Sequence, residues 1–233
     1  MPSEIEMVAR AADTKLNLAQ AKLDPEFFYM SLPLCVIDAV FSIGVNYSGV
    51  RKAVKRYCDT YGLQEYRIPQ LELPPISDQE SITSFCMKAE EAGPQKMAQE
   101  VFCNSQRTSS RGGILKAQAV LEFAKVLRGF GIDNFQDIAK ANYLGEIASE
   151  VRRIKGQKSG ISLKYFWMLA GDQDLIKPDR MILGFLKSAL GHEVTESGAE
   201  GILRGATAIL RTTYPHLTPR LLDNTMWNYQ RSQ

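Results

Sequence analysis

Residues 151–186 read VRRIKGQKSGISLKYFWMLAGDQDLIKPDRMILGFL, and they decide the fold expected of the chain around them. The stretch 155–160 is polar, short and rich in glycine, which favours a tight connection after the end of a helix. From Ile161 onward, apolar residues recur at helical spacing. The pattern therefore predicts two helices joined by a polar hairpin, with a third helix starting at Asp179.

The connection has the composition of an anion-binding turn. A glycine-bearing turn that opens a helix leaves backbone N–H groups without intrahelical partners, at the positive end of the helix dipole. Glycine lets a phosphate approach the main chain, and lysines on the rim add positive charge. We therefore expect the turn to bind one nucleic-acid phosphate without reading a base. The residues predicted to make this contact are Lys155, Gly156, Gln157, Lys158, Ser159 and Gly160.

The segment resembles the helix-hairpin-helix motif of the DNA glycosylase superfamily that includes endonuclease III and the alkylated-base glycosylases. In those proteins an L-P-G-V-G-x-K-T-A-like hairpin is followed, after a helix and a loop, by an Asp that precedes another helix. Residues 154–160 match the hairpin, and residues 177–180 match the position of the Asp. The resemblance covers about residues 32–186.

The resemblance implies an all-α fold of two helical lobes with a DNA- and base-binding cleft between them. It implies one glycosylase-like unit over residues 1–233, with a lobe of residues 1–30 and 180–233 and a central lobe of residues 31–179. The residues favour the same class independently, because the chain has no sustained alternation and no Asn-Gly or Asp-Gly turn.

Asp179 is the predicted catalytic residue. Hydrolysis of an N-glycosidic bond builds positive charge on the deoxyribose, and a carboxylate beside the sugar stabilises that charge and orients or deprotonates water. Asp179 also follows Pro178 and precedes an apolar run, so it suits a helix N-cap. The two roles are compatible, since a cap position fixes the direction of the carboxylate.

Two positions depart from the hairpin of the family. Gly160 stands where members that also cleave the DNA strand keep a Schiff-base lysine. This difference favours a monofunctional glycosylase without lyase activity. Lys158 replaces the second glycine of the hairpin, which changes the turn expected there.

A second polar segment, NSQRTSSRGG at residues 104–113, precedes a predicted helix. Its hydroxyl groups, arginines and glycines suit phosphate contacts, and Arg107, Ser109 and Arg111 are the candidates. A flexible surface loop without a ligand explains the same composition equally well.

The wedge and the base pocket have weaker candidates. The loop at residues 42–49 falls where family members carry the residues that fill the gap left by a flipped base, so Asn46 and Tyr47 are predicted wedge residues. Asp38 lies in an apolar helix, where it serves either as a structural partner of a buried Arg or backbone N–H or as a wall of the base pocket. Tyr165 is a candidate pocket residue or a core residue.

The composition sets limits on cofactors and location. The net charge of +2 does not indicate nucleic-acid binding, although a local basic face is compatible with it. No apolar run reaches the length of a membrane span, and no basic-then-apolar leader begins the chain, so a cytoplasmic protein is expected. The cysteines, Cys35, Cys58, Cys86 and Cys103, are widely spaced and expected to be reduced core residues, so no metal and no cofactor is predicted.

The sequence therefore predicts a monomeric hydrolase that acts on double-stranded DNA, flips out a modified base and leaves an abasic site. Two classes of base fit: a damaged or alkylated base, as in DNA repair, and a hypermodified base of phage DNA, as in antiviral defence. The alternative is a non-catalytic helix-hairpin-helix protein that binds DNA. A third interpretation is an all-α protein-interaction domain in which the turn has no ligand.

Overall fold

The computed structural model describes residues 2–44, 47–68, 72–141 and 143–233. Within these ranges the chain is helical and forms no β-strand, apart from isolated bridges between Tyr29 and Tyr66 and between Arg107 and Leu115. The predicted all-α fold class is confirmed. The α-helices are α1 (Glu4–Lys15), α2 (Leu32–Phe41), α3 (Tyr47–Tyr61), α4 (Ile82–Ala92), α5 (Pro94–Lys96), α6 (Lys116–Gly129), α7 (Phe135–Ile138), α8 (Leu144–Arg153), α9 (Ile161–Ala170), α10 (Arg180–Leu190), α11 (Glu196–Leu210) and α12 (Pro219–Arg231).

The chain divides into two compact units. The central unit is Pro25–Ala170, and the terminal unit joins Met1–Asp24 to Gly171–Gln233. The division expected from the sequence, at residues 30 and 179, falls a few residues further along the chain than these boundaries. The hairpin segment therefore belongs to the central unit and Asp179 to the terminal unit.

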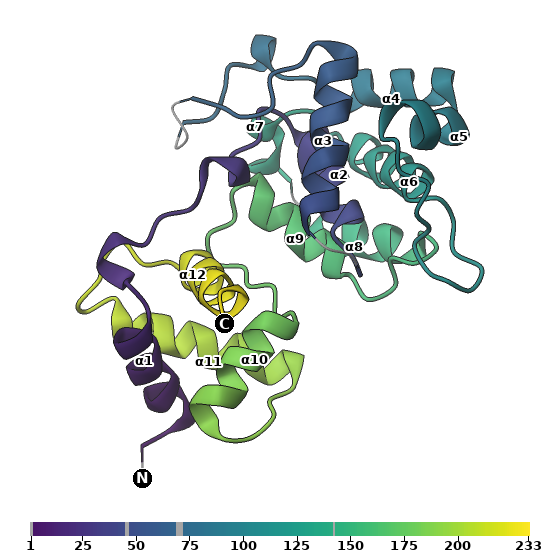
Figure 1. The fold of residues 1–233 in the computed structure, drawn as a ribbon. Coiled ribbons are helices and arrows are strands. Elements are labelled where there is room, and N and C mark those ends of the chain that lie inside the picture. The colour runs from purple at the N-terminus through teal and green to yellow at the C-terminus, as the bar shows by residue number, and fades with distance from the viewer. Residues whose placement is uncertain (1, 45–46, 69–71, 142) are drawn as a thin grey trace. The chain divides into compact units, whose positions relative to one another are not determined.

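The central unit is built around α2, as Figure 1 shows. Every residue of α2 is buried, because its sequence LPLCVIDAVF is apolar on nearly every side. A helix of this kind needs neighbours all round, and α2 packs against α3, α6 and α9. The hairpin that precedes α9 is thereby attached to the most buried helix of the unit.

A lysine from α6 closes the end of α2. The Nζ of Lys116 donates hydrogen bonds to the carbonyl oxygens of Phe41, at 2.9 Å, and of Ile43, at 2.8 Å. The last carbonyls of a helix have no intrahelical partner, so a buried amine satisfies them. Burial lowers the pKa of Lys116 to about 8.

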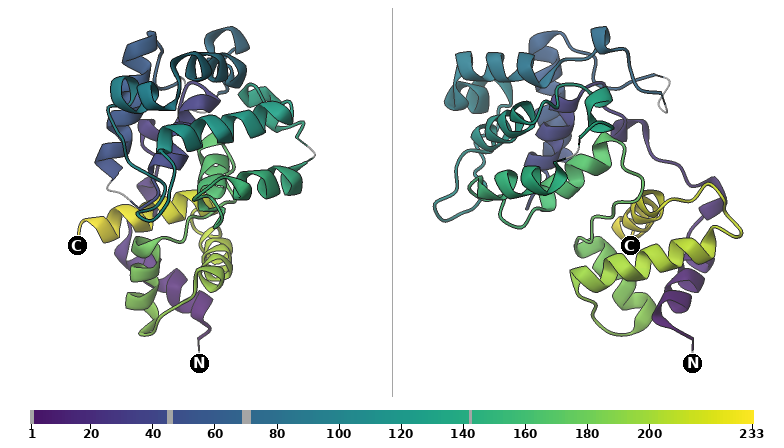
Figure 2. Two further views of the ribbon diagram at one scale, coloured as in Figure 1. Left: turned by 90° about the vertical axis from the view of Figure 1, so that its right-hand side faces the viewer. Right: turned by 180° about the vertical axis from the view of Figure 1, so that it is seen from behind.

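The terminal unit is a bundle of α1, α10, α11 and α12 (Figure 2). Helix α1 begins in a capping box in which Ser3 and Glu6 bond each other's backbone N–H. It packs closely on α11, since a Cβ at Gly205 would lie 2.6 Å from Cδ1 of Ile5. The core between the helices contains Val8, Ala12, Ile182, Phe185, Leu203, Leu222 and Met226.

The first helix of the terminal unit is short. Helix α1 ends at Lys15 and is followed by a short 3-10 turn, Leu18–Gln20. Leu16 adopts an extended conformation there, and Leu16 and Leu18 are both buried in the core of the terminal unit. No helix in the described part of the chain is long and apolar enough to cross a bilayer.

The cysteines differ in exposure. Cys35, Cys58 and Cys86 are buried, as expected. Cys103 is exposed, so its predicted core position is wrong. The π-helix Met97–Val101 ends just before it, and Cys103 adopts a left-handed conformation with a φ of 44° at the surface.

Candidate functional site

The predicted hairpin is a compact turn between α8 and α9. Its backbone folds back on itself, because Gln157 donates to the carbonyl of Ile154 at 2.9 Å and Gly160 donates to the carbonyl of Gln157 at 3.0 Å. Gly156 and Gly160 have φ values of 90° and 73°. These left-handed conformations explain the glycines at both positions.

The turn divides its side chains between the interior and the solvent. The buried residues are Ile154, Gln157 and Gly160, and the exposed ones are Lys155, Gly156, Lys158 and Ser159. The amide of Gln157 is anchored by Ser162, whose hydroxyl donates to its oxygen. The Gln157 side chain therefore supports the turn from within, whereas the sequence suggested a DNA contact. Lys155 and Lys158 remain on the outer rim.

The second polar segment is closed by backbone hydrogen bonds. Thr108 donates to the carbonyl of Ile114 at 2.9 Å, and Lys116 donates to the carbonyl of Gln106 at 2.8 Å. We call residues 106–116 the closed loop. The predicted contact residue Arg107 has an internal role, since its Nη1 donates to the carbonyl of Gly113 at 2.7 Å.

Glycine permits a very close approach inside the closed loop. A Cβ at Gly113 would lie 2.4 Å from the backbone nitrogen of Ser109. The hydroxyl of Ser109 donates to the carbonyl of Arg111 at 3.1 Å, which leaves the exposed Arg111 side chain at the tip. The segment is therefore a defined turn held by its own backbone, not an irregular loop.

The closed loop packs on the hairpin. A Cβ at Gly156 would lie 2.3 Å from Cβ of Thr108, so the Thr108 side chain rests directly on the hairpin backbone. The Nζ of Lys155 lies 4.0 Å from the position of a Cβ at Gly112. Two segments that the sequence predicted separately as phosphate contacts thus lie together on the central unit.

The segments that form this junction carry exposed cations. The guanidinium of Arg152 lies beside Gly160, with its Nε 3.1 Å from the position of a Cβ there. We call four exposed cations the basic rim: Arg111 of the closed loop, Lys155 and Lys158 of the hairpin, and Arg152 in the last turn of α8. A rim of this kind, with backbone N–H groups at the start of α9, suits the phosphates of a nucleic-acid backbone.

Asp179 is the N-cap of α10. Its Oδ1 accepts hydrogen bonds from the backbone N–H groups of Met181, at 2.8 Å, and Ile182, at 3.3 Å. Its Oδ2 accepts a hydrogen bond from Nε1 of Trp227 at 3.1 Å. The side chain is half-buried, so the carboxylate has a fixed direction and partial access to solvent.

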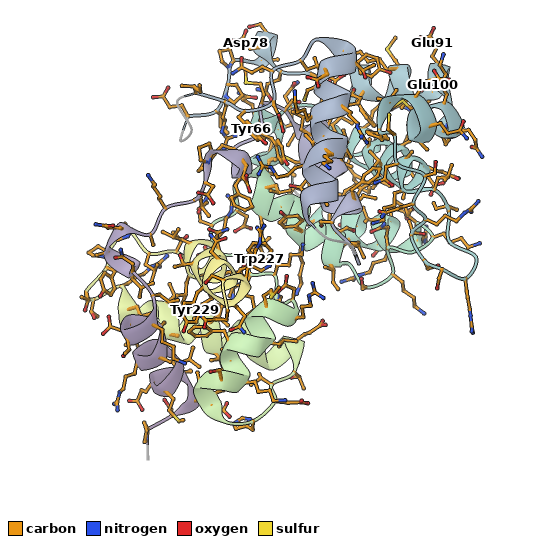
Figure 3. All side chains as sticks on the ribbon, viewed as in Figure 1. Tyr66, Asp78, Glu91, Glu100, Trp227 and Tyr229 are labelled. Atoms are coloured by element: carbon orange, nitrogen blue, oxygen red, sulfur yellow. The ribbon has the colours of Figure 1, made fainter. Side chains whose placement is uncertain are left out.

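A second carboxyl group, that of Asp223, bonds the backbone two residues before Asp179. Asp223, on α12, is buried, and its Oδ1 accepts a hydrogen bond from the backbone N–H of Lys177 at 3.2 Å. Burial holds the pKa of Asp223 well above its usual range, and the charge of Asp179 raises it further. Figure 3 shows the side chains, with Trp227 labelled on α12.

The sequence did not single out Asp223 or Trp227 as site residues. A signal for both was present. Arg220, Asp223 and Trp227 are spaced at i, i+3 and i+7, so their polar groups share one face of a helix that also carries buried Leu222 and Met226. Polar groups on the buried side of a helix require hydrogen-bond partners. Asp223 and Trp227 find theirs at Lys177 and Asp179, just before α10.

The predicted wedge and pocket residues are placed as follows. Asp38 is fully buried in α2, where the hydroxyl of Tyr29 donates to its Oδ2 at 2.9 Å. Tyr165 is buried in α9. Asn46 and the side chain of Tyr47 lie outside the described residues. Asp38 and Tyr165 thus have interior positions in the central unit.

Among the residues that the structure describes, no group of three or more His, Cys, Asp or Glu side chains is arranged to hold a metal ion. The comparison with curated proteins and the comparison with solved structures find no match. The model of one protein family matches residues 6–231, nearly the whole chain. The chain therefore belongs to the family described as a domain of unknown function, DUF8548.

Proposed function

We propose that this protein is a monofunctional DNA glycosylase. It binds double-stranded DNA that contains a damaged, alkylated or hypermodified base, extrudes that base and hydrolyses its N-glycosidic bond, leaving an abasic site. The observation that carries the proposal is the junction of the hairpin with the closed loop, where Gly156 rests against Thr108. It gives the central unit a basic surface formed by two packed turns instead of one isolated hairpin.

The hairpin supports a phosphate contact by its construction. Gln157 and Ile154 hold it from inside, so Lys155 and Lys158 stay on the solvent side. Two positively charged side chains beside the start of α9 reinforce the field of the helix terminus. Contacts of this type bind any sequence, which suits an enzyme that searches DNA for one unusual base.

Asp179 supports the chemistry. A carboxylate that is ionised and fixed beside the deoxyribose stabilises the positive charge that develops as the glycosidic bond breaks, and it orients the attacking water. Hydrogen bonds from backbone N–H groups and from Trp227 restrict both carboxylate oxygens of Asp179. Its half-buried position leaves access for a water molecule.

The geometry at Gly160 supports a reaction without strand cleavage, because a Schiff-base lysine cannot occupy that position. Its φ of 73° is strained for any residue with a side chain, and a Cβ there would meet the guanidinium of Arg152 at 3.1 Å. A Schiff-base lysine therefore does not fit the turn as it is built. The buried thiols of Cys58 and Cys86 support a reducing compartment, the cytoplasm, and we propose that the enzyme acts there as a monomer.

The test is base release. Purified protein is incubated with DNAs that contain uracil, hypoxanthine, alkylated bases or oxidised bases, and with phage DNA that carries modified cytosines. Free bases are identified by mass spectrometry, and strand breaks are scored with and without hot alkali. We expect release of one class of base, with breaks only after alkali. Breaks without alkali would mean that a lysine of the basic rim acts as a lyase nucleophile.

The matched variant is Asp179→Asn. Asparagine is a good N-cap, so α10 should be retained, and the amide nitrogen that replaces Oδ2 cannot accept the Trp227 N–H, which should cost about 1 to 3 kcal/mol of stability. Excision should fall on the order of 10²- to 10⁴-fold, because the negative charge is lost. Fluorescence anisotropy with the same DNA should give an unchanged binding constant. Full excision by Asp179→Asn would exclude the catalytic role.

One observation favours a second candidate, a DNA-binding protein without catalysis. Both carboxylate oxygens of Asp179 already accept hydrogen bonds, as a purely structural cap would. This candidate predicts DNA binding through the basic rim, no base release from any DNA, and no effect of Asp179→Asn on binding. The base-release panel separates the two candidates.

A further inference from the structure

Helix α12 contacts the segment that leads into α10 at three points. The hydrogen bonds are Arg220 N–H to the carbonyl of Gln173 at 3.0 Å, Lys177 N–H to Oδ1 of Asp223 at 3.2 Å, and Nε1–H of Trp227 to Oδ2 of Asp179 at 3.1 Å. Asp223 and Trp227 make their contacts with side chains that lie four residues apart on one face of α12, and Arg220 makes its contact with the backbone N–H in the first turn of the helix. The segment 173–179 is thus bonded to α12 at Gln173, Lys177 and Asp179.

We propose that Asp223 and Trp227 are positioning residues for Asp179, which fix the direction of its carboxylate for excision. The inference rests on the proposed function, because it assigns these residues a role in that reaction. Neither residue needs to touch DNA. Each acts through the atoms that it holds: Trp227 through Oδ2 of Asp179, and Asp223 through the backbone at Lys177.

Trp227 completes the restraint on the carboxylate. The backbone N–H groups of Met181 and Ile182 bond Oδ1 of Asp179, and a bond at Oδ2 further limits rotation about the last side-chain bond. The indole N–H supplies that bond. The plane of the indole is itself supported, because the guanidinium of Arg231 lies over it at 5.3 Å from the ring centroid.

Asp223 restrains the backbone before the cap. It accepts the Lys177 N–H, and the carbonyl of Lys177 accepts the N–H of Asp179 at 2.7 Å. A displacement at Lys177 therefore reaches the cap residue directly. The charged groups around Asp223 are Asp179, which raises its pKa, and Lys177 and Arg220, which lower it, while burial raises it most. Asparagine, a neutral hydrogen-bond acceptor of similar shape, should therefore be able to take the place of Asp223 and accept the Lys177 N–H.

The first test is Trp227→Phe, which removes the N–H and keeps an aromatic ring. The matched control is Trp167→Phe on α9, which makes the same change at the other tryptophan of the chain. Single-turnover base release by Trp227→Phe should be about 10- to 100-fold slower, the range that follows from losing a hydrogen bond to a charged group. DNA affinity should be unchanged, and the control should match wild type in both measurements.

The second test compares Asp223→Asn with Asp223→Ala. The asparagine oxygen can accept the Lys177 N–H, so Asp223→Asn should keep most of the excision rate. Asp223→Ala removes the acceptor and should lower the rate at least as much as Trp227→Phe. Thermal melts followed by circular dichroism confirm that each variant is folded at the assay temperature. If Asp223→Ala does not fold, the Trp227→Phe result decides.

The outcomes separate this inference from the proposed function. No release by the wild type from any DNA would refute the function, and the inference with it. Release by the wild type at a rate that Trp227→Phe preserves would overturn the inference alone. Equal losses in Asp223→Asn and Asp223→Ala would also overturn it, since the charge of Asp223 would then matter and its hydrogen bond would not.

Discussion

The Cα of Gly156 faces the side chain of Thr108, and this contact joins the hairpin to the closed loop. Two separate requirements select glycine there. Its φ of 90° lies in the left-handed region, and a Cβ would approach Cβ of Thr108 to 2.3 Å. The first requirement concerns the conformation of the turn, and the second concerns the packing between two segments distant in sequence.

A pair of alanine substitutions separates these requirements. Gly62→Ala is the matched control, because Gly62 has a φ of 64° and nothing within 4 Å of the added Cβ. It should lower the free energy of unfolding by about 1 to 2 kcal/mol, the cost of a left-handed alanine. Gly156→Ala should lower it by about 2 to 4 kcal/mol, because overpacking against Thr108 adds to that cost. Urea denaturation at equilibrium measures both, and equal losses would contradict the packing role of Thr108.

The buried end of α2 depends on one amine from α6. Lys116 satisfies the carbonyls of Phe41 and Ile43, and the surrounding protein lowers its pKa to about 8 by burial. An unfolded lysine titrates at about 10.4. Between these two values the unfolded chain binds more protons than the folded one, so the free energy of unfolding rises with pH across this window. Below pH 8 the cost of burying the charge is present in full.

Lys116→Met removes both the hydrogen bonds and the titration. At pH 7 it should lower the free energy of unfolding by about 1 to 3 kcal/mol, because two carbonyls lose their donor. Between pH 7.5 and pH 10 the stability gap between wild type and Lys116→Met should widen by about 2 kcal/mol in favour of the wild type. Chemical denaturation at intervals of pH measures the gap. A constant gap would show that Lys116 titrates normally.

The whole chain carries a net charge of only +2, yet the basic rim concentrates cations on one part of the central unit. Total charge is a poor guide to such a surface, because acidic residues elsewhere cancel it in the sum but not in space. Several other exposed cations are locally neutralised, as in the ion pairs of Lys55 with Asp59 and of Lys96 with Glu100.

The salt dependence of DNA binding tests the basic rim. The double variant Lys155→Ala/Lys158→Ala should reduce the slope of log K against log salt concentration by about two, because each lysine that neutralises a phosphate contributes about one. The control Lys55→Ala/Lys96→Ala removes two exposed lysines of the same unit that are paired with acids. It should leave the slope unchanged. Equal slopes in wild type and both double variants would place DNA binding elsewhere.

Local sequence predicted the parts of the candidate site that depend on neighbours in the chain. The turn at 155–160 follows from its glycines, and the N-cap at Asp179 follows from a short polar residue before an apolar run. Local sequence missed Asp223 and the indole bond of Trp227, whose partners lie more than forty residues away in the chain. It also placed Gln157 on the outside, since nothing local reveals that Ser162 holds it from within.

The sequence by itself determined the all-α class, the hairpin between α8 and α9 and the cap of α10, because helical periodicity, glycine conformation and capping are properties of a few adjacent residues. The tertiary structure alone decided that Thr108 rests on Gly156, that Lys116 closes α2 and that α12 holds the segment before Asp179. Each of these contacts joins residues far apart in the chain. Which residues meet depends on how the helices pack, because packing decides which polar groups are buried together and which backbones come close.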